Sequence, residues 1–383
     1  MLRYLTAGES HGPALVVVVE GVPAGLVITV EQIGDELARR RLGFGRGPRM
    51  RFERDDVELI GGIHHGLTLG SPISVVIHNT EWPKWQDEMS PAPGITEKPL
   101  TQPRPGHADL VGMQKYGFDD ARNVLERASA RETAARVAAG TIAKALLAEL
   151  GTTVISHVIR MGEAAVPDGA PRPSGADIDR IDESTVRCFD PDSEAAMVTA
   201  IKAAAKAGDS LGGVVEVLGF GVPVGLGSHV HWDRRIDGRI AQALMSIQAM
   251  KAVEIGEGSA VAAVRGSDAH DEIMWDETAG YTRGSHRAGG IEGGMTTGSL
   301  LVARASMKPL ASLNRPVLRT VDVMTKQETV SFKERTDVTA VPAAGVVAET
   351  MVALVLADEA LRKFGGDSMR ELTRNHREFV ASL

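Results

Sequence analysis

The stretch from Arg104 to Gly140 combines residue types suited to acid–base and anion chemistry. It reads RPGHADLVGMQKYGFDDARNVLERASARETAARVAAG and runs into an Ala-rich helix. Arg127 and Arg131 lie four positions apart, so on a helix they would share one face. Ser129 adds a hydroxyl between them, and the N–H groups of a first helical turn add a positive field. His107 follows Pro-Gly, in a turn that can aim its ring. These residues predict an anion site at a helix N-terminus.

A second histidine and an arginine-rich loop lie nearer the N-terminus. Ser10 and His11 belong to the Gly-flanked loop AGESHGPA, where an imidazole can protonate a leaving oxyanion because it titrates near neutrality. Taken alone, a surface-loop histidine is the more ordinary interpretation. Arginine binds phosphate and carboxylate in a bidentate manner, so the basic loop suits a small polyanion, although a solvated loop or a subunit interface stays open. The basic run comprises Arg39, Arg40, Arg41, Arg46, Arg49, Arg51 and Arg54.

Three further segments give weaker signals. The run Lys308–Ser312 follows a strand and offers a lysine and a hydroxyl to a phosphate. Arg335 and Asp337 precede a long apolar helix, where an ordinary salt bridge is the simpler interpretation. The Gly-rich run 289–298 lets a backbone approach a ligand closely, or forms a set of tight turns.

Metal and nucleotide motifs give no positive prediction. His229, His231 and Asp233 would face one side of a strand and could suit zinc, but no fourth ligand cluster accompanies them. We therefore predict no metal site. A phosphate-loop lysine after glycine, a helix-opening GxGxxG and HExxH are all missing, so a nucleotide-like cofactor would have to bind in another way.

Composition limits the class of protein. The chain has 383 residues, 43% hydrophobic and 24% charged, which is ordinary for a soluble globular protein with a large core. The net charge of −8 argues against broad nucleic-acid binding and makes local arginine clusters stand out as specific anion sites. Cys188 is the single cysteine, so an intrachain disulfide is impossible and a cytoplasmic location is expected. The start MLRYLTAGESHG lacks the apolar region of a signal peptide, and the apolar runs are too short to span a bilayer.

The expected helices have recognisable ends. Thr29-x-x-Gln32 is a capping box that opens a helix ending near Gly43. Asp190 would cap a helix that begins at Pro191 and ends near Gly208. The other expected helices are 129–150, 239–253 and 342–364, the last apolar nearly all round and therefore buried.

The expected strands are interspersed with these helices, without strict alternation, which indicates an α+β fold in one large domain, residues 1–383. The strands are 2–6, 15–19, 57–60, 73–77, 154–161, a pair within 212–227, 299–305 and 317–323. The polar excursions 79–105 and 280–297 are candidates for closing over a site. The loops GESHG and RGSHRAGG are faintly alike, a weak hint of a duplicated half.

Taken together, these segments resemble one family along nearly the whole chain. GESHGPAL, RRRLGFGRGPRM, RPGHAD, KYG with DDAR, ERASARETAARVAAG, VEIGEG, RAGGIEGGMTTG, MKPLAS, RTDV and VPAAGVVAETMVALVLA occur in the order typical of chorismate synthase. The resemblance implies a 1,4-elimination with anti geometry. 5-Enolpyruvylshikimate 3-phosphate loses phosphate and a ring proton to give chorismate, and reduced FMN is required without net redox change.

The resemblance also implies roles for single residues. His11 would lie by the leaving phosphate and give it a proton, with Ser10 beside it. His107 would stabilise the reduced, anionic flavin, and Asp337 would help the flavin N5 accept the substrate proton. The substrate carries a phosphate and two carboxylates, so many arginines are expected. The implied anion contacts are Arg40, Arg46, Arg49, Arg104, Arg131 and Arg335.

The implied FMN contacts come from several separate segments. They are Arg127, Ala128, Ser129, Gln248, Ala249, Gly293, Lys308, Pro309, Leu310, Ala311, Ser312 and Arg335. The family fold is a helical layer sandwiched between antiparallel sheets, assembled as a homotetramer. Members are monofunctional or carry an NADPH-driven flavin reductase, and since nothing here resembles a separate reductase domain, a monofunctional enzyme is expected.

Two other classes of protein are compatible with parts of the sequence. An ordinary FMN oxidoreductase would consume NADPH with every turnover, whereas a lyase needs reductant only for priming. A binding module would use the Gly/Arg loops to grip RNA or another polyanion. The acidic net charge and the scarcity of aromatics near the arginine run count against this last interpretation. A partner membrane or nucleic acid is not expected.

Overall fold

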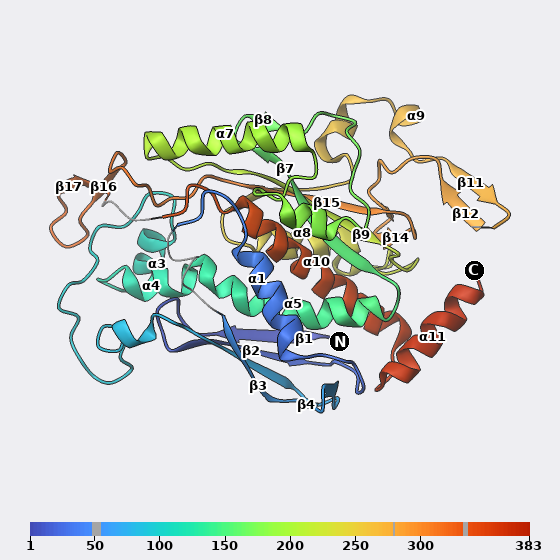
Figure 1. The fold of residues 1–383 in the computed structure, drawn as a ribbon, viewed down its shortest axis with the longest axis horizontal. Coiled ribbons are helices and arrows are strands. Elements are labelled where there is room, and N and C mark those ends of the chain that lie inside the picture. Colours follow the sequence, from blue (N-terminus) through green and yellow to red (C-terminus); the bar gives the residue numbers. More distant parts are fainter. Residues whose placement is uncertain (48–54, 279, 332–335) are drawn as a thin grey trace.

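Two antiparallel sheets enclose a layer of helices in the computed structural model, which describes residues 1–47, 55–278, 280–331 and 336–383 (Figure 1). The first sheet has the order β1-β2-β6-β3, with β1 Arg3–Ala7, β2 Ala14–Glu20, β6 Ile73–His78 and β3 Asp56–Gly61. The second has the order β10-β15-β9-β7-β8, with β10 Met250–Ile255, β15 Leu301–Met307, β9 Gly213–Phe220, β7 Thr153–Met161 and β8 Ala164–Ala165. The predicted α+β sandwich is therefore confirmed.

The helical layer contacts both sheets. It consists of α1 Val30–Arg41, α5 Thr133–Ala148, α8 Ile236–Met245 and α10 Val341–Phe364. Helix α5 packs on β2 and β6, and α10 packs on β7 and β9. Within the described residues, the other α-helices are α3 Asp109–Tyr116, α4 Arg122–Ala128, α6 Ile178–Glu183, α7 Pro191–Ala207, α9 Gly266–Ala269 and α11 Met369–Ala381. Short hairpins complete the fold: β4 Ile63–His64 with β5 Leu67–Thr68, β11 Ile273–Asp276 with β12 Gly280–Arg283, β13 Ile291–Glu292 with β14 Met295–Thr296, and β16 Arg319–Val321 with β17 Glu328–Val330.

Local sequence explains why these elements form. In β2, Leu15 and Val17 point into the core while the intervening side chains remain partly exposed, the period of a strand with one covered face. Thr29 and Gln32 form the predicted capping box of α1, whose buried face continues to Arg40. Asp190 caps α7 as predicted, by accepting from the Ser193 N–H.

Helix α10 is the central element of the helical layer. Its length and hydropathy would suffice to cross a bilayer, yet 94% of the apolar stretch is buried inside the protein. It begins beside Ala340 and ends at Gly365, whose φ of 63° suits glycine. Because side chains on every face of α10 are buried, it contacts α1, α5 and α8 as well as the second sheet.

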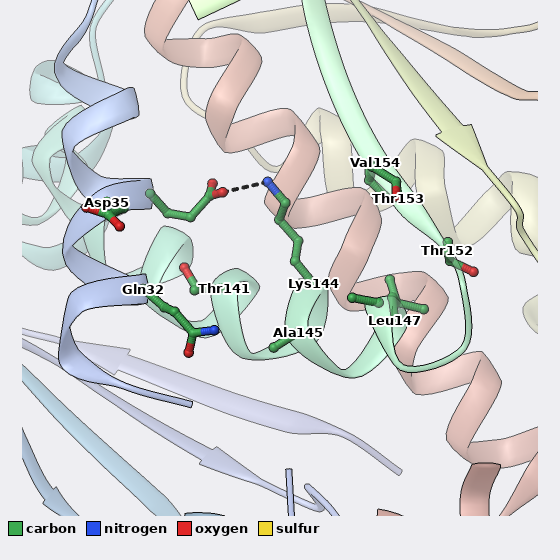
Figure 2. Close-up of a pocket in the computed structure, with 11 residues that line it drawn as sticks. Gln32, Asp35, Thr141, Lys144, Ala145, Leu147, Thr152, Thr153 and Val154 are labelled. Carbon is green, nitrogen blue, oxygen red and sulfur yellow. Dashed lines mark hydrogen bonds and ion pairs between the residues drawn. The ribbon is translucent and has the colours of Figure 1, made fainter. Parts of the chain in front are cut away.

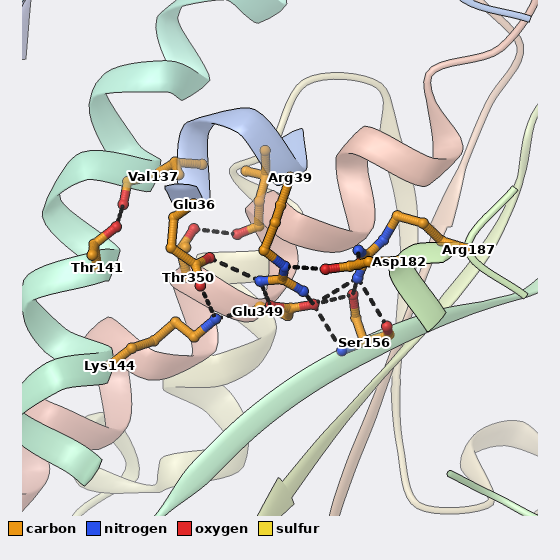
Figure 3. A network of polar contacts seen from close by, with 11 residues as sticks. Glu36, Arg39, Val137, Thr141, Lys144, Ser156, Asp182, Arg187, Glu349 and Thr350 are labelled. Carbon is orange, nitrogen blue, oxygen red and sulfur yellow. Dashed lines mark hydrogen bonds and ion pairs between the residues drawn. The ribbon is translucent and has the colours of Figure 1, made fainter. Parts of the chain in front are cut away.

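A buried ionic network ties the layers together (Figure 3). The fully buried Glu349 of α10 accepts from Arg39 of α1 at 2.9 Å and from Lys144 of α5 at 3.1 Å. Its other oxygen accepts from Arg187 at 2.9 Å and from the Ser156 hydroxyl of β7 at 2.8 Å. These cations hold the pKa of Glu349 far below its usual range, although burial alone would raise it. The carboxylate therefore fixes α1, α5 and α10 relative to the second sheet.

The structure contains a loop-and-hairpin unit that occurs twice. It is formed mainly by segments other than the loops GESHG and RGSHRAGG. The segment GVPAGL at 21–26 corresponds to GVPVGL at 221–226. The segment GGIHHGLTLGS at 61–71 corresponds to GGIEGGMTTGS at 289–299. Both longer segments fold into two-residue hairpins with equivalent register, Ile63 opposite Thr68 and Ile291 opposite Thr296.

The two copies use the same hydrogen bonds. Thr68 donates its hydroxyl to the Pro23 carbonyl at 2.6 Å and accepts from the Leu26 N–H at 2.9 Å. Thr296 donates to the Pro223 carbonyl at 2.6 Å and accepts from the Leu226 N–H at 2.8 Å. Each hairpin thus anchors the loop that leaves its sheet, and the sandwich has an approximate internal repeat.

Some predicted elements were wrong in extent. The predicted helix 239–253 is two elements, since α8 ends at Met245 and β10 begins at Met250. Neither Gly nor Pro marks the end of α8, which passes into a turn at Ser246, and Ala249 adopts a left-handed φ of 66° just before β10. The predicted strand pair within 212–227 is one strand, β9, followed by turns at Gly221 and Gly225. The predicted strand 317–323 shortens to β16, and helix α5 starts only at Thr133.

Candidate active site

The loop that carries Ser10 and His11 is held in a fixed shape. Gly8 adopts a φ of +97°, and a Cβ atom there would lie 2.3 Å from the Ala14 carbonyl oxygen, so only glycine fits. The Asn79 amide donates to the carbonyl oxygens of Glu9 at 3.1 Å and Gly12 at 2.8 Å. This bracing explains how a Gly-flanked loop can present a histidine in one orientation.

His11 is anchored to a buried carboxylate. Its Nδ1 lies 2.9 Å from Oε1 of Glu126 in α4, and its backbone N–H donates to Oε2 at 2.8 Å. Glu126 is 1% exposed; burial alone would raise its pKa, but the hydrogen bonds and charge of His11 lower it. The Trp85 ring stacks on His11 with centroids 4.1 Å apart. Trp85 lies in the 79–105 excursion, so this segment contacts His11.

Ser10 and Ser129 bring the first loop and the RASARET segment together. Their hydroxyl oxygens lie 3.3 Å apart, and the Ser10 N–H donates to the Glu126 carbonyl at 3.0 Å. Ser129 interrupts the helix with an extended ψ of 142° and its hydroxyl accepts from the Arg131 N–H. Arg127 and Arg131 therefore do not share a helix face as predicted, because Arg127 closes α4 and Arg131 lies in the following 3₁₀ turn, Ala130–Glu132.

His107 has a buried carboxylate partner of its own. Its Nδ1 hydrogen-bonds Asp109, which is 1% exposed and also accepts from Arg104 Nε at 2.8 Å. Burial alone would raise the pKa of Asp109, but the hydrogen bonds from His107 and Arg104 hold it well below its usual range. Arg104 also donates to the Ser312 hydroxyl at 3.0 Å. The RPGHAD turn is thereby joined to the predicted flavin loop.

The loop Lys308–Ser312 connects three predicted segments. The Lys308 N–H donates to the Ala249 carbonyl at 3.0 Å, and its Nζ donates to the Gly106 carbonyl at 2.6 Å. The Leu310 carbonyl accepts from the Ser210 hydroxyl at 2.8 Å, which fixes the middle of the loop between Pro309 and Ala311. Segments predicted from positions far apart in the chain are therefore neighbours.

Gln248 and Arg127 line the same region from the other side. Gln248 Nε2 donates to Glu132 at 3.1 Å, and Glu132 also accepts from the Thr6 hydroxyl at 2.9 Å. Arg127, the neighbour of Ala128, donates to the carbonyl oxygens of Thr6 at 2.8 Å and Gly8 at 3.1 Å. The buried Oε1 of Gln248 has no hydrogen-bond partner among the described residues. A buried acceptor in this position can be satisfied by a donor on a ligand.

The predicted arginines divide into groups. Arg40 and Arg131 are 4% and 5% exposed. Arg40 donates to Thr133 at 3.0 Å, and Arg131 donates to Asn79 at 3.1 Å and pairs with Asp55. Both thus lie near the start of α5, next to Ser129. Arg49 and Arg335 lie outside the described residues.

Arg46 and Asp337 form a separate pair at the start of α10. Arg46 Nε lies 3.1 Å from Oδ2 of Asp337, and the Gly47 N–H donates to Oδ1 at 2.5 Å. A hollow of about 420 Å³ adjoins this pair and is lined by cations from three segments: Arg41 at the end of α1, Arg46 in the following loop and Lys202 of α7. This cationic lining supports the prediction that the basic loop is an anion-binding segment.

Gly293 does not join the other predicted residues. It lies at the tip of the β13–β14 hairpin, whose Met295 bridges to Gly227. The Gly227 N–H donates to Glu359 near the end of α10, whereas Asp337 precedes Val341 at the start of that helix. At 1.5 Å per residue these two ends of α10 are about 27 Å apart. Figure 1 shows β14 and helices α3 and α4 on opposite sides of the molecule.

The segment that carries His231 and Asp233 is exposed. Trp232–Arg234 is a 3₁₀ turn and not a strand, and His231 bonds Asp233 at 2.7 Å on the surface. No group of three or more potential metal ligands assembles within the described ranges.

A cavity of about 370 Å³ between α1, α5 and β7 contains none of the predicted site residues. Gln32, Asp35 and Lys144 are among the residues that line it (Figure 2).

Sequence reasoning missed the acidic partners of the site. Four residues hold the predicted ones in place although none was predicted to do so. They are the acids Asp109, Glu126 and Glu132 and the amide Asn79. Asp109 lies inside RPGHAD, two positions after His107, and Glu126 begins ERASARET, directly before Arg127. Their position in those segments was the available signal, because neither residue type nor spacing shows that a carboxylate will be buried against a histidine.

Two histidines, several arginines and a lysine-containing loop between antiparallel sheets define an enzyme that acts on a small polyanionic molecule. The family model described as chorismate synthase matches residues 2–361. Chorismate synthases of Thermobifida fusca and Streptomyces coelicolor are 59% and 58% identical, covering 100% of this chain and 99% and 98% of theirs. A crystal structure of chorismate synthase matches with a TM-score of 0.80 at 41% identity, covering 100% of this chain and 98% of the other.

The chain belongs to the chorismate synthase family. It is a carbon–oxygen lyase of aromatic amino acid biosynthesis, and its family converts 5-enolpyruvylshikimate 3-phosphate into chorismate and phosphate. The family uses reduced FMN.

Proposed function

We propose that the residues gathered around His11 and His107 carry out this elimination. The supporting observation is that each histidine has its Nδ1 on a buried carboxylate. The Arg104–Ser312 hydrogen bond joins the His107 segment to the loop Lys308–Ser312, and the Ser10–Ser129 contact joins the His11 loop to the segment ERASARET. In the reaction a ring carbon–oxygen bond to phosphate breaks and a ring C–H bond breaks on the opposite face. The chain must therefore bind the anionic groups, protonate the leaving phosphate and help remove a proton.

His11 is the group that gives a proton to the departing phosphate oxygen. Its Nδ1 faces Glu126, so Nε2 is the nitrogen through which the ring acts. Ser10 and Ser129 place two hydroxyls beside it as hydrogen-bond donors. General acid catalysis of this type contributes about 10²- to 10⁴-fold to a rate.

The substrate's phosphate and carboxylates are bound by the arginines Arg40, Arg46, Arg49, Arg104, Arg131 and Arg335. Three of them, Arg40, Arg104 and Arg131, are almost fully buried and are held by side chains and carbonyls, so their guanidinium groups are fixed before the substrate arrives. Fixed donors in a water-poor site stabilise developing negative charge without having to reorganise.

Reduced FMN fits the residues on the other side of the site. Gln248 offers a buried acceptor, and Arg127, Ser129, Lys308 and Ser312 offer donors. Ala128, Ala249, Pro309, Leu310 and Ala311 supply backbone and apolar contacts along the same segments. When bound, reduced FMN supplies transient electron donation that assists loss of the phosphate. His107 contributes a cationic or hydrogen-bonding ring against negative charge, and Asp109 keeps that ring in place.

Asp337 is the carboxylate that helps to remove the ring proton of the substrate. Arg46 and the Gly47 N–H hold both of its oxygens, so its orientation is fixed at the start of α10.

A homotetramer explains the position of Gly293. The hairpin of Gly293 is bound near Glu359, about 27 Å along α10 from the helix start that follows Asp337, so a contact between Gly293 and FMN would be made in the site of another copy. We further propose that residues 1–383 act as one domain, since the main buried cluster runs from Leu15 to Leu372, and that the protein works in the cytoplasm without nucleic-acid or membrane partners.

An anaerobic assay tests the function. Purified protein is mixed with dithionite-reduced FMN and 5-enolpyruvylshikimate 3-phosphate, and chorismate absorbance and free phosphate are followed together. Equal amounts of both without lasting flavin oxidation are expected. Product formed with NADPH and oxidised FMN alone would show that the chain also reduces its flavin. No product from folded protein in either mixture would contradict the proposal.

A further inference from the structure

Glu126 hydrogen-bonds both the backbone N–H and the ring of His11. Its Oε2 accepts from the His11 backbone N–H at 2.8 Å, and both oxygens lie within 3.0 Å of Nδ1. The Glu126 carbonyl also accepts from the Ser10 N–H at 3.0 Å. One buried residue of α4 therefore fixes the backbone and the ring of a residue 115 positions away.

Among the described residues, Trp85 contacts the His11 ring, and charged groups from two segments lie nearby. Trp85 stacks against its face at a centroid distance of 4.1 Å and an interplanar angle of 32°. Arg122 of α4 lies over the Trp85 ring at 5.1 Å, 3.3 Å from Glu126 and 3.0 Å from Glu88. Glu9 is the other acid in the loop that holds His11. Of the acids named here, only Glu126 has a hydrogen bond to the ring.

We propose that Glu126 is a positioning residue that fixes the neutral His11 ring as the Nδ1–H tautomer and directs Nε2 to the leaving phosphate. The inference rests on the role proposed above for His11. Nδ1 has to carry hydrogen to bond a carboxylate, since an ionised carboxylate only accepts. The tautomer of a histidine is set by the hydrogen bond that the other nitrogen makes, so Nε2 is the basic atom of the neutral ring. Nε2 therefore takes up the proton from water before the reaction, and the resulting Nε2–H is the one that the imidazolium gives to the phosphate.

The first test needs no variant. Long-range proton–nitrogen NMR of the ¹⁵N-histidine-labelled enzyme, assigned with His11→Ala, shows which ring nitrogen carries hydrogen when His11 is neutral. Hydrogen on Nδ1 is expected. Hydrogen on Nε2 would overturn the proposal, even for an enzyme that makes chorismate normally. A wild-type enzyme that makes no chorismate but shows hydrogen on Nδ1 would instead contradict the proposed function and leave the positioning intact.

Glu126→Gln tests the consequence. The amide keeps the size of the side chain, but its NH₂ group must face either the two His11 donors or Arg122, so its hydrogen bonds to His11 weaken. We expect the neutral ring to lose its preference for Nδ1–H and kcat to fall about 10²-fold, with KM little changed. Glu88→Gln is the matched control: it removes a charge from the same arginine without touching His11, and its kcat and tautomer should equal those of the wild type.

A double-mutant cycle separates positioning from mere stabilisation. If Glu126 acts through His11, Glu126→Gln should cause no further loss of kcat in a His11→Ala background. An equal loss of kcat in both backgrounds, or an unchanged tautomer in Glu126→Gln, would overturn the proposal.

Discussion

The Nδ1 atom of His107 donates to the buried carboxylate of Asp109, and Arg104 holds the other oxygen of that carboxylate at 2.8 Å. His11 and Glu126 repeat the arrangement with a different acid on a different helix. Both proposed catalytic histidines thus have one ring nitrogen committed to a buried carboxylate, while the rest of the ring remains partly exposed.

His107→Ala should reduce kcat by about 10²-fold or more, because the ring is the cationic or donor group placed beside the predicted flavin loop. The fold should survive, since the side chain is 22% exposed and Arg104 still pairs with Asp109. Chorismate formation under anaerobic conditions is the measurement, with circular dichroism as the check on folding. His231→Ala, which changes an exposed histidine, is the control. Activity near that of the control would remove His107 from the mechanism.

Gly293 should act in the site of another copy. Gly293→Val replaces a residue with a φ of 58° at a hairpin tip, where nothing but the Met295 side chain approaches within 4 Å among the described atoms. Gly293→Val and His107→Ala should each be nearly inactive, whereas oligomers assembled from both chains should regain activity in some sites. Light scattering gives the number of copies. No recovery in mixed oligomers, with folded protein, would contradict the placement of Gly293 in a neighbouring site.

The sequence predicted the fold where a local signal existed. The capping box of α1, the cap of α7 and the alternating strands β2 and β6 depend on neighbours within a few positions, and all were found. The end of α8 was missed because no Gly or Pro follows Met245, and the left-handed turn at Ala249 before β10 is not indicated by its residue type. In the site, histidines and arginines could be predicted from their chemistry. Their carboxylate partners could not, since His11 meets Glu126 across 115 positions.

Glu216 should make stability depend on pH. Burial alone would raise its pKa, but hydrogen bonds from His157 and Arg172 and the charges of Arg172 and Arg304 lower it to about 2 from 4.5. Because the pKa is lower in the folded state, the stabilisation is fully present above pH 4.5 and is lost as the pH falls toward 2. It amounts to about 3 kcal/mol at pH 7. Urea unfolding of Glu216→Gln and wild type should differ at pH 7, differ by less as the pH falls below 4.5, and converge near pH 2; a constant difference would contradict this account.

Glu349→Gln should be the most destabilising of these changes, because the carboxylate faces Arg39, Lys144 and Arg187 in the middle of the helical layer. Without the negative charge, the fully buried Arg187 loses its ion pair with α10, a loss that costs about 3–5 kcal/mol in buried networks. Glu359→Gln on the same helix is a matched control. Glu359 is equally buried, but its partners Arg239 and Arg362 are 29% and 46% exposed and can turn toward water. The free energy of unfolding from urea titration should therefore fall by clearly more in Glu349→Gln. An equal loss of unfolding free energy in both variants would mean that the burial of the partner cations does not determine how much stability is lost.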